Sequence, residues 1–186
     1  MNQRATQAQI YRRRRIILLA FVALIGYLIY LAVAAIGAMF TPKPVVATSS
    51  NCKPGVVSVT AFAGDGTDHL TVFDAKTNPL VWFSVVNTGK KACTFNVGPA
   101  VQFFTIKSGD QLIWTSKQCN RVGLTDQQMV LQPNKAKLSP PSEWLRVYSS
   151  GGGCGKGQAP ALPGSYTLSV EVNKVMSSNY EQFEIQ

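Results

Sequence analysis

The sequence has 186 residues, 46% of them hydrophobic and 15% charged, and it carries a net charge of +9. Five of the positive charges lie within residues 1–15, which contain no acidic residue, and the remaining +4 is scattered over the rest of the chain. Proteins that bind nucleic acid gather Lys and Arg on one stripe or patch. Beyond residue 15 the charge forms no long run, so we expect no nucleic acid as a partner. Its only concentrations are Lys90-Lys91 and the trio Lys135, Lys137 and Arg146. Such a mildly basic region suits anionic surfaces such as wall polymers or lipid headgroups, and ordinary solvated charge is the alternative.

Residues 16–40 form an apolar segment of twenty-five positions without a charge, directly after Arg12, Arg13, Arg14 and Arg15. A helix rises about 1.5 Å per residue and a bilayer core is about 30 Å thick, so this segment is long enough to span a membrane. By the positive-inside rule, the Arg run keeps residues 1–15 in the cytoplasm and places the rest of the chain outside. A nucleic-acid patch is the alternative for the Arg run, but its position against the apolar segment favours a role in topology.

A cleaved signal peptide is the competing interpretation of the apolar segment, because Ala32-Val33-Ala34 and Ala35 are small residues of the cleavage type. Signal-peptide apolar regions run for about 7–15 residues, which is far shorter than this segment. We therefore expect a retained single-pass anchor in the cell membrane, with the lipid bilayer as a partner. Residues 41–51 are rich in Pro, Ser and Thr and predict a semi-rigid linker. Residues 52–186 have the length of one extracytoplasmic domain.

Alternating apolar and polar residues beyond the linker predict β-strands. The clearest run is at 166–172, where Tyr, Leu, Val and Val alternate with Thr, Ser and Glu. Further strand patterns lie at 81–87 and 101–106, and turn sequences such as Asn87-Thr-Gly and Leu162-Pro-Gly-Ser separate the runs. No helical stripe follows residue 40. The pattern predicts an all-β fold, an antiparallel β-sandwich preceded by one transmembrane helix.

Four cysteines all follow the apolar segment: Cys52, Cys93, Cys119 and Cys154. An even number in an extracytoplasmic segment predicts two disulfides. A zinc site is the alternative, but there is no C-x-x-C motif and the chain has one histidine. If a strand over 55–62 pairs antiparallel with a strand over 80–87, Cys52 lies beside Cys93. Cys119 then pairs with Cys154, whose glycine-rich loop can bend toward it.

Several motifs in this region resemble those of a known group of domains. An N-T-G-x-x-x-C turn lies at 87–93, a W-x-S-x-x-C end at 114–119 and P-G-x-Y at 163–166. This order resembles a group of actinobacterial extracytoplasmic domains and is similar to the BsuPI-like domain, which is named for a bacterial intracellular proteinase inhibitor. The matching positions, within about residues 55–175, are Gly109, Ile113, Trp114, Trp144, Pro163, Gly164 and Tyr166.

The resemblance implies an immunoglobulin-like sandwich with a binding or structural role. It does not carry over inhibitor activity, because no reactive-loop residues match and because the cysteines and the anchor differ from an intracellular inhibitor. We expect Trp114 and Trp144 to pack in the core, although ligand stacking is the alternative for both rings. Pro163 and Gly164 predict a turn, and the hydroxyl of Tyr166 can bond back to a loop backbone.

The search for catalytic chemistry finds no convincing set of residues. His69 lies in a turn-rich segment, and the chain has no G-x-S-x-G nucleophile motif. Asp65, Asp68 and Asp74 suggest a calcium loop, but the full pattern with its distant Glu is missing. The glycine-rich segment 151–157 surrounds a cysteine and is not a phosphate-binding loop. We therefore expect neither an enzyme nor a bound cofactor or metal.

These features predict a membrane-tethered extracytoplasmic interaction or structural module. Its expected partner is a protein of the envelope or membrane, so that the chain acts as an accessory subunit of a larger complex. The alternative is an extracytoplasmic inhibitor of a protease or another hydrolase, which rests on the fold resemblance alone.

Overall fold

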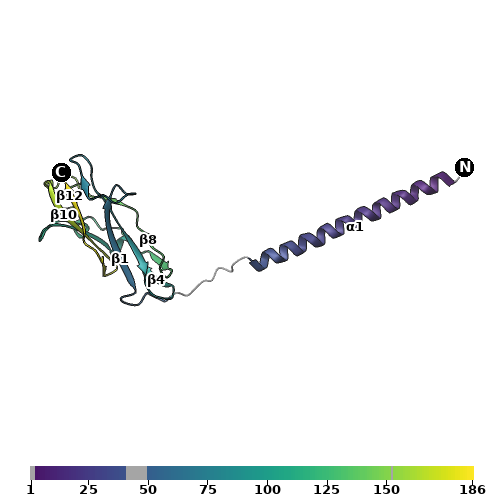
Figure 1. Ribbon diagram of the computed structural model, residues 1–186, viewed down its shortest axis with the longest axis horizontal. Coiled ribbons are helices and arrows are strands. Elements are labelled where there is room, and N and C mark those ends of the chain that lie inside the picture. Colours follow the sequence, from purple (N-terminus) through teal and green to yellow (C-terminus); the bar gives the residue numbers. More distant parts are fainter. Residues whose placement is uncertain (1–2, 41–49, 152) are drawn as a thin grey trace. The chain divides into compact units, whose positions relative to one another are not determined.

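The computed structural model describes residues 3–40, 50–151 and 153–186. The chain divides into two compact units, Met1–Ala47 and Thr48–Gln186. The first unit contains the helix α1 (Gln3–Phe40), and the second contains all of the strands (Figure 1). We call the second unit the β domain.

The helix α1 is 38 residues long, so it begins well before the apolar segment and includes the Arg run. Gln, Ala and Arg are good helix formers, which explains why the helix extends through residues 3–15. Its Arg14–Val33 part is long and apolar enough to cross a membrane, and none of that part is buried against the rest of the chain. A core helix of a soluble domain would bury at least one face. The composition therefore suits a membrane anchor or a signal sequence.

The described residues of the β domain form three sheets. The first has the order β1 (Val57–Gly64), β3 (Leu80–Asn87) and β8 (Lys137–Leu138), with β9 (Ser142–Glu143) also paired to β3. The second has the order β2 (Val72–Phe73), β12 (Glu181–Ile185), β10 (Gly164–Val172), β5 (Gln102–Ser108) and β6 (Gln111–Thr115), with β11 (Val175–Met176) paired to β10. A short ladder joins β4 (Cys93–Asn96) to β7 (Gln128–Leu131). Two 3₁₀ turns, η1 (Pro99–Val101) and η2 (Ser116–Gln118), flank β5 and β6.

The two larger sheets pack face to face, and β1 lies against β10 and β12. The alternation predicted for 166–172 is confirmed, since Tyr166, Leu168, Val170 and Val172 are buried and the residues between them are partly exposed. These side chains meet Val59 and Ala61 of β1 in one hydrophobic core. Figure 1 shows β10 and β12 side by side near the C-terminus. The predicted all-β sandwich is therefore confirmed.

The strand β3 is buried on both faces because it lies between β1 and the short strands β8 and β9. Val81, Phe83 and Val85 face the core, and Trp82 on the opposite face stacks on Phe62 with ring centroids 5.8 Å apart. The expected antiparallel pairing of β1 with β3 is confirmed, with Val57 opposite Asn87 and Gly64 opposite Leu80.

Candidate functional site

The end of the β domain where the chain arrives from the linker is formed by residues 50–57, 86–94, 131–135 and 172–175, and we call it the linker-bearing end. Here β1 begins with Val57 opposite Asn87, and β10 ends at Val172 opposite Gln102. Ser50, in the predicted linker, already pairs with β4, because its carbonyl accepts a hydrogen bond from the Thr94 amide at 3.0 Å. The opposite end, where β1 ends at Gly64 and β10 begins, is the far end.

Asn87 holds the linker-bearing end together and is completely buried. Its Nδ2 donates to the carbonyls of Lys91 (2.8 Å) and Leu131 (3.0 Å), and its Oδ1 accepts from the Gly89 amide (2.9 Å). Buried polar groups are stable only when they are hydrogen-bonded, and this amide satisfies three backbone groups from two segments. The residue that the sequence marks as a turn former therefore also ties the β3–β4 turn to β7.

A cleft of about 720 Å³ opens at this end. Its polar lining comes from Asn51, Lys53, Asn96, Gln128, Asn173 and Lys174. Its apolar lining comes from Val57, Phe95, Val175 and Met176. No Asp or Glu is among the described residues that line it. The Oδ1 atom of Asn96 accepts from the amides of Gly98 and Gln127, which fixes one wall of the cleft.

Another wall is the two-residue turn between β10 and β11, where Asn173 and Lys174 have φ angles of 47° and 68°. A two-residue hairpin turn with positive φ at both positions strongly prefers Asn-Gly. Asn173 fits this preference, but Lys174 occupies the second turn position, where Gly adopts a positive φ most easily. The chain thus accepts an unfavourable backbone conformation at a residue whose cation lines the cleft.

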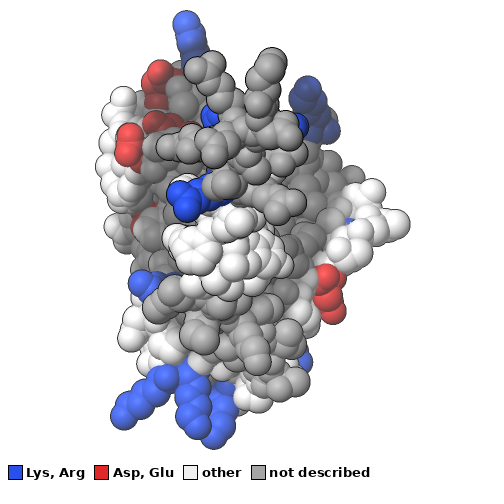
Figure 2. Space-filling model, turned by 90° about the vertical axis from the view of Figure 1, so that its right-hand side faces the viewer, with Lys and Arg blue, Asp and Glu red and all other residues white. Residues whose placement is uncertain are grey.

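Five exposed lysines surround the linker-bearing end: Lys53, Lys90, Lys91, Lys135 and Lys174. Lys90 and Lys91 lie in the β3–β4 turn, and Lys135 follows Asn134, whose amide donates to the Asn87 carbonyl at 2.8 Å. Figure 2 shows Lys and Arg side chains at several separate places on the face in view, with one group at the lower edge and the Asp and Glu side chains elsewhere. The sequence shows Lys90-Lys91 as a local concentration, and the fold adds Lys53, Lys135 and Lys174 at the same end.

Both disulfides have the pairing predicted from the sequence. Cys52 is bonded to Cys93 and Cys119 to Cys154, with Cα–Cα distances of 4.8 and 4.9 Å. The first bond joins the start of the domain to β4 and lies at the edge of the cleft. The second bond lies beside Trp114, whose Nε1 donates to the Cys154 carbonyl at 2.8 Å. Gly153 and Gly157 adopt positive φ angles in the loop that carries Cys154, as the expected bend requires.

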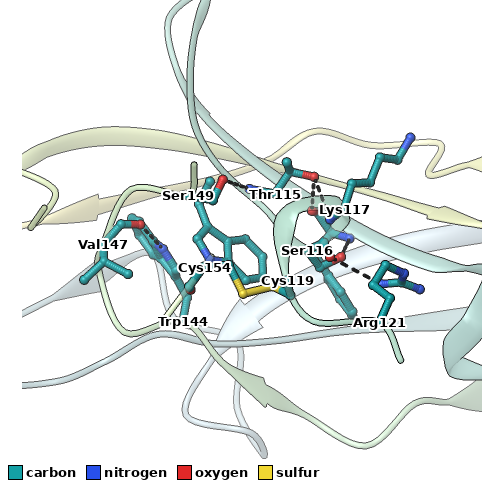
Figure 3. The surroundings of a disulfide bond; sticks show 11 residues. Thr115, Ser116, Lys117, Cys119, Arg121, Trp144, Val147, Ser149 and Cys154 are labelled. Carbon is teal, nitrogen blue, oxygen red and sulfur yellow. Dashed lines mark hydrogen bonds between the residues drawn. A yellow bond between two sulfur atoms is a disulfide. The ribbon is translucent and has the colours of Figure 1, made fainter. Parts of the chain in front are cut away.

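Figure 3 shows how the loops around the Cys119–Cys154 bond are held. The Oγ atom of Ser149 accepts from the Thr115 amide, and Oγ1 of Thr115 accepts from the Lys117 amide. The Arg121 guanidinium donates to the carbonyls of Ser116, Pro99, Ala100 and Gln102 and lies 4.5 Å from the centroid of the Phe103 ring. Partial burial lowers the pKa of Arg121. Its donors are directed at backbone, so this cation has a structural role.

The large side chains among the positions that match the BsuPI-like motifs lie in the core. Trp114 and Trp144 are buried, and Nε1 of Trp144 donates to the Val147 carbonyl at 3.1 Å. The Tyr166 hydroxyl donates to the Leu162 carbonyl, as predicted, and burial raises the pKa of this phenol. Gly164, after Pro163, has a φ of 150° at the start of β10. Core packing accounts for both indoles, and neither ring lies open for ligand stacking.

The residues considered for catalysis or calcium have other roles. His69 contacts the Glu181 carboxylate through Nε2, a partner that the sequence analysis did not identify because it lies 112 residues away. Oδ1 of Asp65 accepts from the amides of Thr67 and Asp68, and Oδ1 of Asp74 accepts from those of Lys76 and Thr77. Within the described residues, no group of three or more His, Cys, Asp or Glu side chains is placed to hold a metal ion.

No family model and no curated protein matches the sequence. Structures with some similarity include a β-glucosidase from Erythrobacter marinus (13% identity, TM-score 0.40, covering 70% of this chain and 15% of that one). Others are the Pseudomonas fluorescens alkylpurine DNA glycosylase AlkC (12%, TM-score 0.40, 70% and 30%) and the CARDB domain of the PF1109 protein from Pyrococcus furiosus (14%, TM-score 0.32, 70% and 90%). The chain spans less than a third of the first two proteins. At these identities and TM-scores, their names say nothing about the function of this chain.

Proposed function

We propose that this protein is a membrane-tethered module whose β domain lies outside the cytoplasm and binds a partner in the membrane or envelope. The observation that carries the proposal is the combination of an unburied apolar helix with a β domain closed by two disulfides. Disulfides persist in oxidising compartments, whereas an unburied helix of this composition needs lipid around it. The Arg run before the helix sets the orientation, with that side in the cytoplasm.

A binding role, not catalysis, is the second part of the proposal. His69 is paired with Glu181, and the carboxylates of Asp65 and Asp74 accept from nearby backbone amides. The cleft at the linker-bearing end offers amides, lysine ammonium groups and an apolar floor, which suits recognition of a ligand. The residues of this cleft are therefore the proposed binding surface.

The lysine distribution provides a direct test of topology. Residues 1–40 contain no Lys, whereas the linker has Lys43 and the β domain has many, so lysine labelling of intact cells by a membrane-impermeant amine reagent reports on the residues that follow the apolar segment. We expect strong labelling of intact cells and an intact mass that includes residues 16–40. The matched variant, in which Arg12, Arg13, Arg14 and Arg15 are all changed to Glu, should lose most of this labelling until the cells are lysed. Labelling of the parent chain only after lysis, or a mature chain starting near Ala35, would contradict the proposal.

Purification of the tagged full chain in mild detergent tests the binding role against the inhibitor alternative. Stoichiometric membrane subunits would support an accessory module. A captured hydrolase that regains activity when the chain is removed would instead establish an inhibitor.

A further inference from the structure

The β domain is electrically polarised between its two ends. Its five clustered lysines lie at the linker-bearing end, as described above. Six of the nine carboxylates of the sequence lie at or near the far end: Asp65, Asp68, Asp74, Asp110, Glu143 and Glu184. Of the other three, Glu171 accepts from Lys117 Nζ at 2.9 Å, Glu181 is paired with His69, and Asp126 lies in the loop before β7. The cationic end is thus the end that the linker reaches.

The linker limits how far the linker-bearing end can lie from the membrane. Ten peptide steps separate Phe40 at the end of α1 from Ser50, and they span at most about 36 Å when fully extended. The eight residues of β1 add about 25 Å between the two ends of the β domain. The tether therefore keeps the linker-bearing end within about 36 Å of the end of α1, whereas the far end can lie about 25 Å farther away.

The cleft has the chemistry of a site for an anionic headgroup. Lys53 and Lys174 supply two ammonium groups, and Asn51 and Asn173 supply amide donors on the same rim. Met176 is 52% exposed beside them and offers an apolar contact for the glycerol backbone or the first methylenes. A single site of this kind binds weakly, but the tether keeps the headgroups at a high effective concentration, so weak binding is sufficient.

We propose that the linker-bearing end of the β domain binds anionic phospholipid headgroups of the membrane that holds α1, with one headgroup in the cleft between Lys53 and Lys174. This inference rests on the proposed membrane tethering and identifies the surface that the tether presents. Lys90, Lys91 and Lys135 surround the cleft and contact neighbouring headgroups. Binding fixes the orientation of the β domain, so that the far end faces away from the membrane toward other partners.

The test uses the full chain reconstituted into phosphatidylcholine vesicles, with or without phosphatidylglycerol. A trace amount of an impermeant amine reagent is added, and the labelling rate of each lysine is measured by mass spectrometry. With phosphatidylglycerol, we expect Lys53, Lys174 and Lys90 to react about fivefold more slowly, the factor that corresponds to ~1 kcal/mol per lysine at an anionic surface. Lys76 and Lys107, toward the far end, should react at unchanged rates. Addition of 1 M salt, where the Debye length is about 3 Å, should abolish the protection.

Two matched double variants separate the cleft from general charge. Lys53→Gln with Lys174→Gly removes both cleft cations, and Gly suits the positive φ at position 174, so this variant keeps the turn. Lys76→Gln with Lys107→Gln removes two charges elsewhere. The first variant should lose the protection of Lys90, and the second should keep it.

The outcomes distinguish this inference from the proposed function. A chain that alkaline carbonate extracts from the vesicles would contradict the membrane anchor itself. Equal lysine reactivity with and without phosphatidylglycerol, in a chain that resists extraction, would overturn the headgroup site alone. Protection in neutral vesicles only when soluble poly(glycerol phosphate) is added would overturn it in favour of an anionic wall polymer.

Discussion

The two ends of the β domain are stabilised in different ways. Toward the far end, Phe73, Trp144, Tyr166 and Phe183 pack ring against ring, with centroids 5.3–6.0 Å apart. At the linker-bearing end, the Cys52–Cys93 disulfide and the buried amide of Asn87 hold the segments together. The aromatic cluster thus adds large buried apolar area toward the far end. Covalent and polar links hold the other half, which leaves polar side chains free to line a binding surface.

The largest effect should come from the aromatic cluster. Trp144 is fully buried, contacts Tyr166 and Phe183 and donates to a backbone carbonyl. Trp144→Ala should lower the free energy of unfolding by about 3–5 kcal/mol. Pulse proteolysis of the full chain in detergent over a urea series measures this loss. Phe62→Ala removes a partly exposed ring that stacks on the buried Trp82, so it is the control and should cost much less; equal losses would mean that the cluster is not the main source of stability.

Removal of either disulfide should have the next largest effect. The bonds close 41 and 35 residues, so the chain-entropy model gives about 4 kcal/mol for each, and measured values are often lower. Cys52→Ala with Cys93→Ala and Cys119→Ala with Cys154→Ala should therefore lose similar stability in the same assay. The two double variants should differ in their effect on local dynamics. Only the first pair should speed amide exchange around the cleft, and faster exchange there in both would show that the ends are coupled.

The disulfide pairing could be predicted from the sequence because it depends on strand periodicity and on the glycine-rich loop around Cys154. Cys52 and Cys93 flank two strands whose periodicity is clear, and adjacent strands in sequence pair with each other. The core position of Tyr166 followed from the alternation of β10, and that of Trp144 from the large apolar area of its ring. The buried outer face of β3 was missed, because Trp82 is covered by residues that lie far from it in sequence.

The candidate cleft could not be predicted from the sequence. Its lining comes from four separate segments, and Lys53 and Lys174 are 121 positions apart in a chain whose charges look scattered. Lys53 and Lys174 line the same cleft only because the fold places the start of β1, the strand β4 and the end of β10 next to one another. Asn87 was predicted only in part. The sequence indicated its turn, but it did not indicate the hydrogen bond to the Leu131 carbonyl, 44 residues away. Local signals specify turns and strands, whereas sites depend on long-range register.

Asn87 allows a smaller perturbation of the linker-bearing end. Asn87→Ala leaves the Leu131 carbonyl and the Gly89 amide without this partner in a buried place, which should cost about 1–3 kcal/mol. Thr88→Ala removes an exposed hydroxyl that donates to the Val56 carbonyl and is the neighbouring control, with an expected loss below about 1 kcal/mol. Urea pulse proteolysis of both variants measures the difference. A loss for Asn87→Ala no greater than for Thr88→Ala would show that the disulfide alone holds this end.

The smallest effect concerns the far end at acid pH. The backbone amide of Asp68 holds the pKa of Asp65 below its ordinary value of 3.8, and the amide of Lys76 does the same for Asp74. Folding therefore stabilises the ionised form of both side chains. Their stabilisation is fully present above pH 3.8 and is lost as the pH falls through the lower folded pKa of each group. Protection factors of the Asp68 and Thr77 amides should then fall before those of Cys52 and Thr94 at the linker-bearing end. The double variant Asp65→Asn with Asp74→Asn keeps an acceptor oxygen at each position but does not titrate. In this variant the far-end amides should no longer lose protection before those of the linker-bearing end. In the parent chain, added salt should not change the order in which the two ends lose protection, because hydrogen bonds cause most of both pKa shifts.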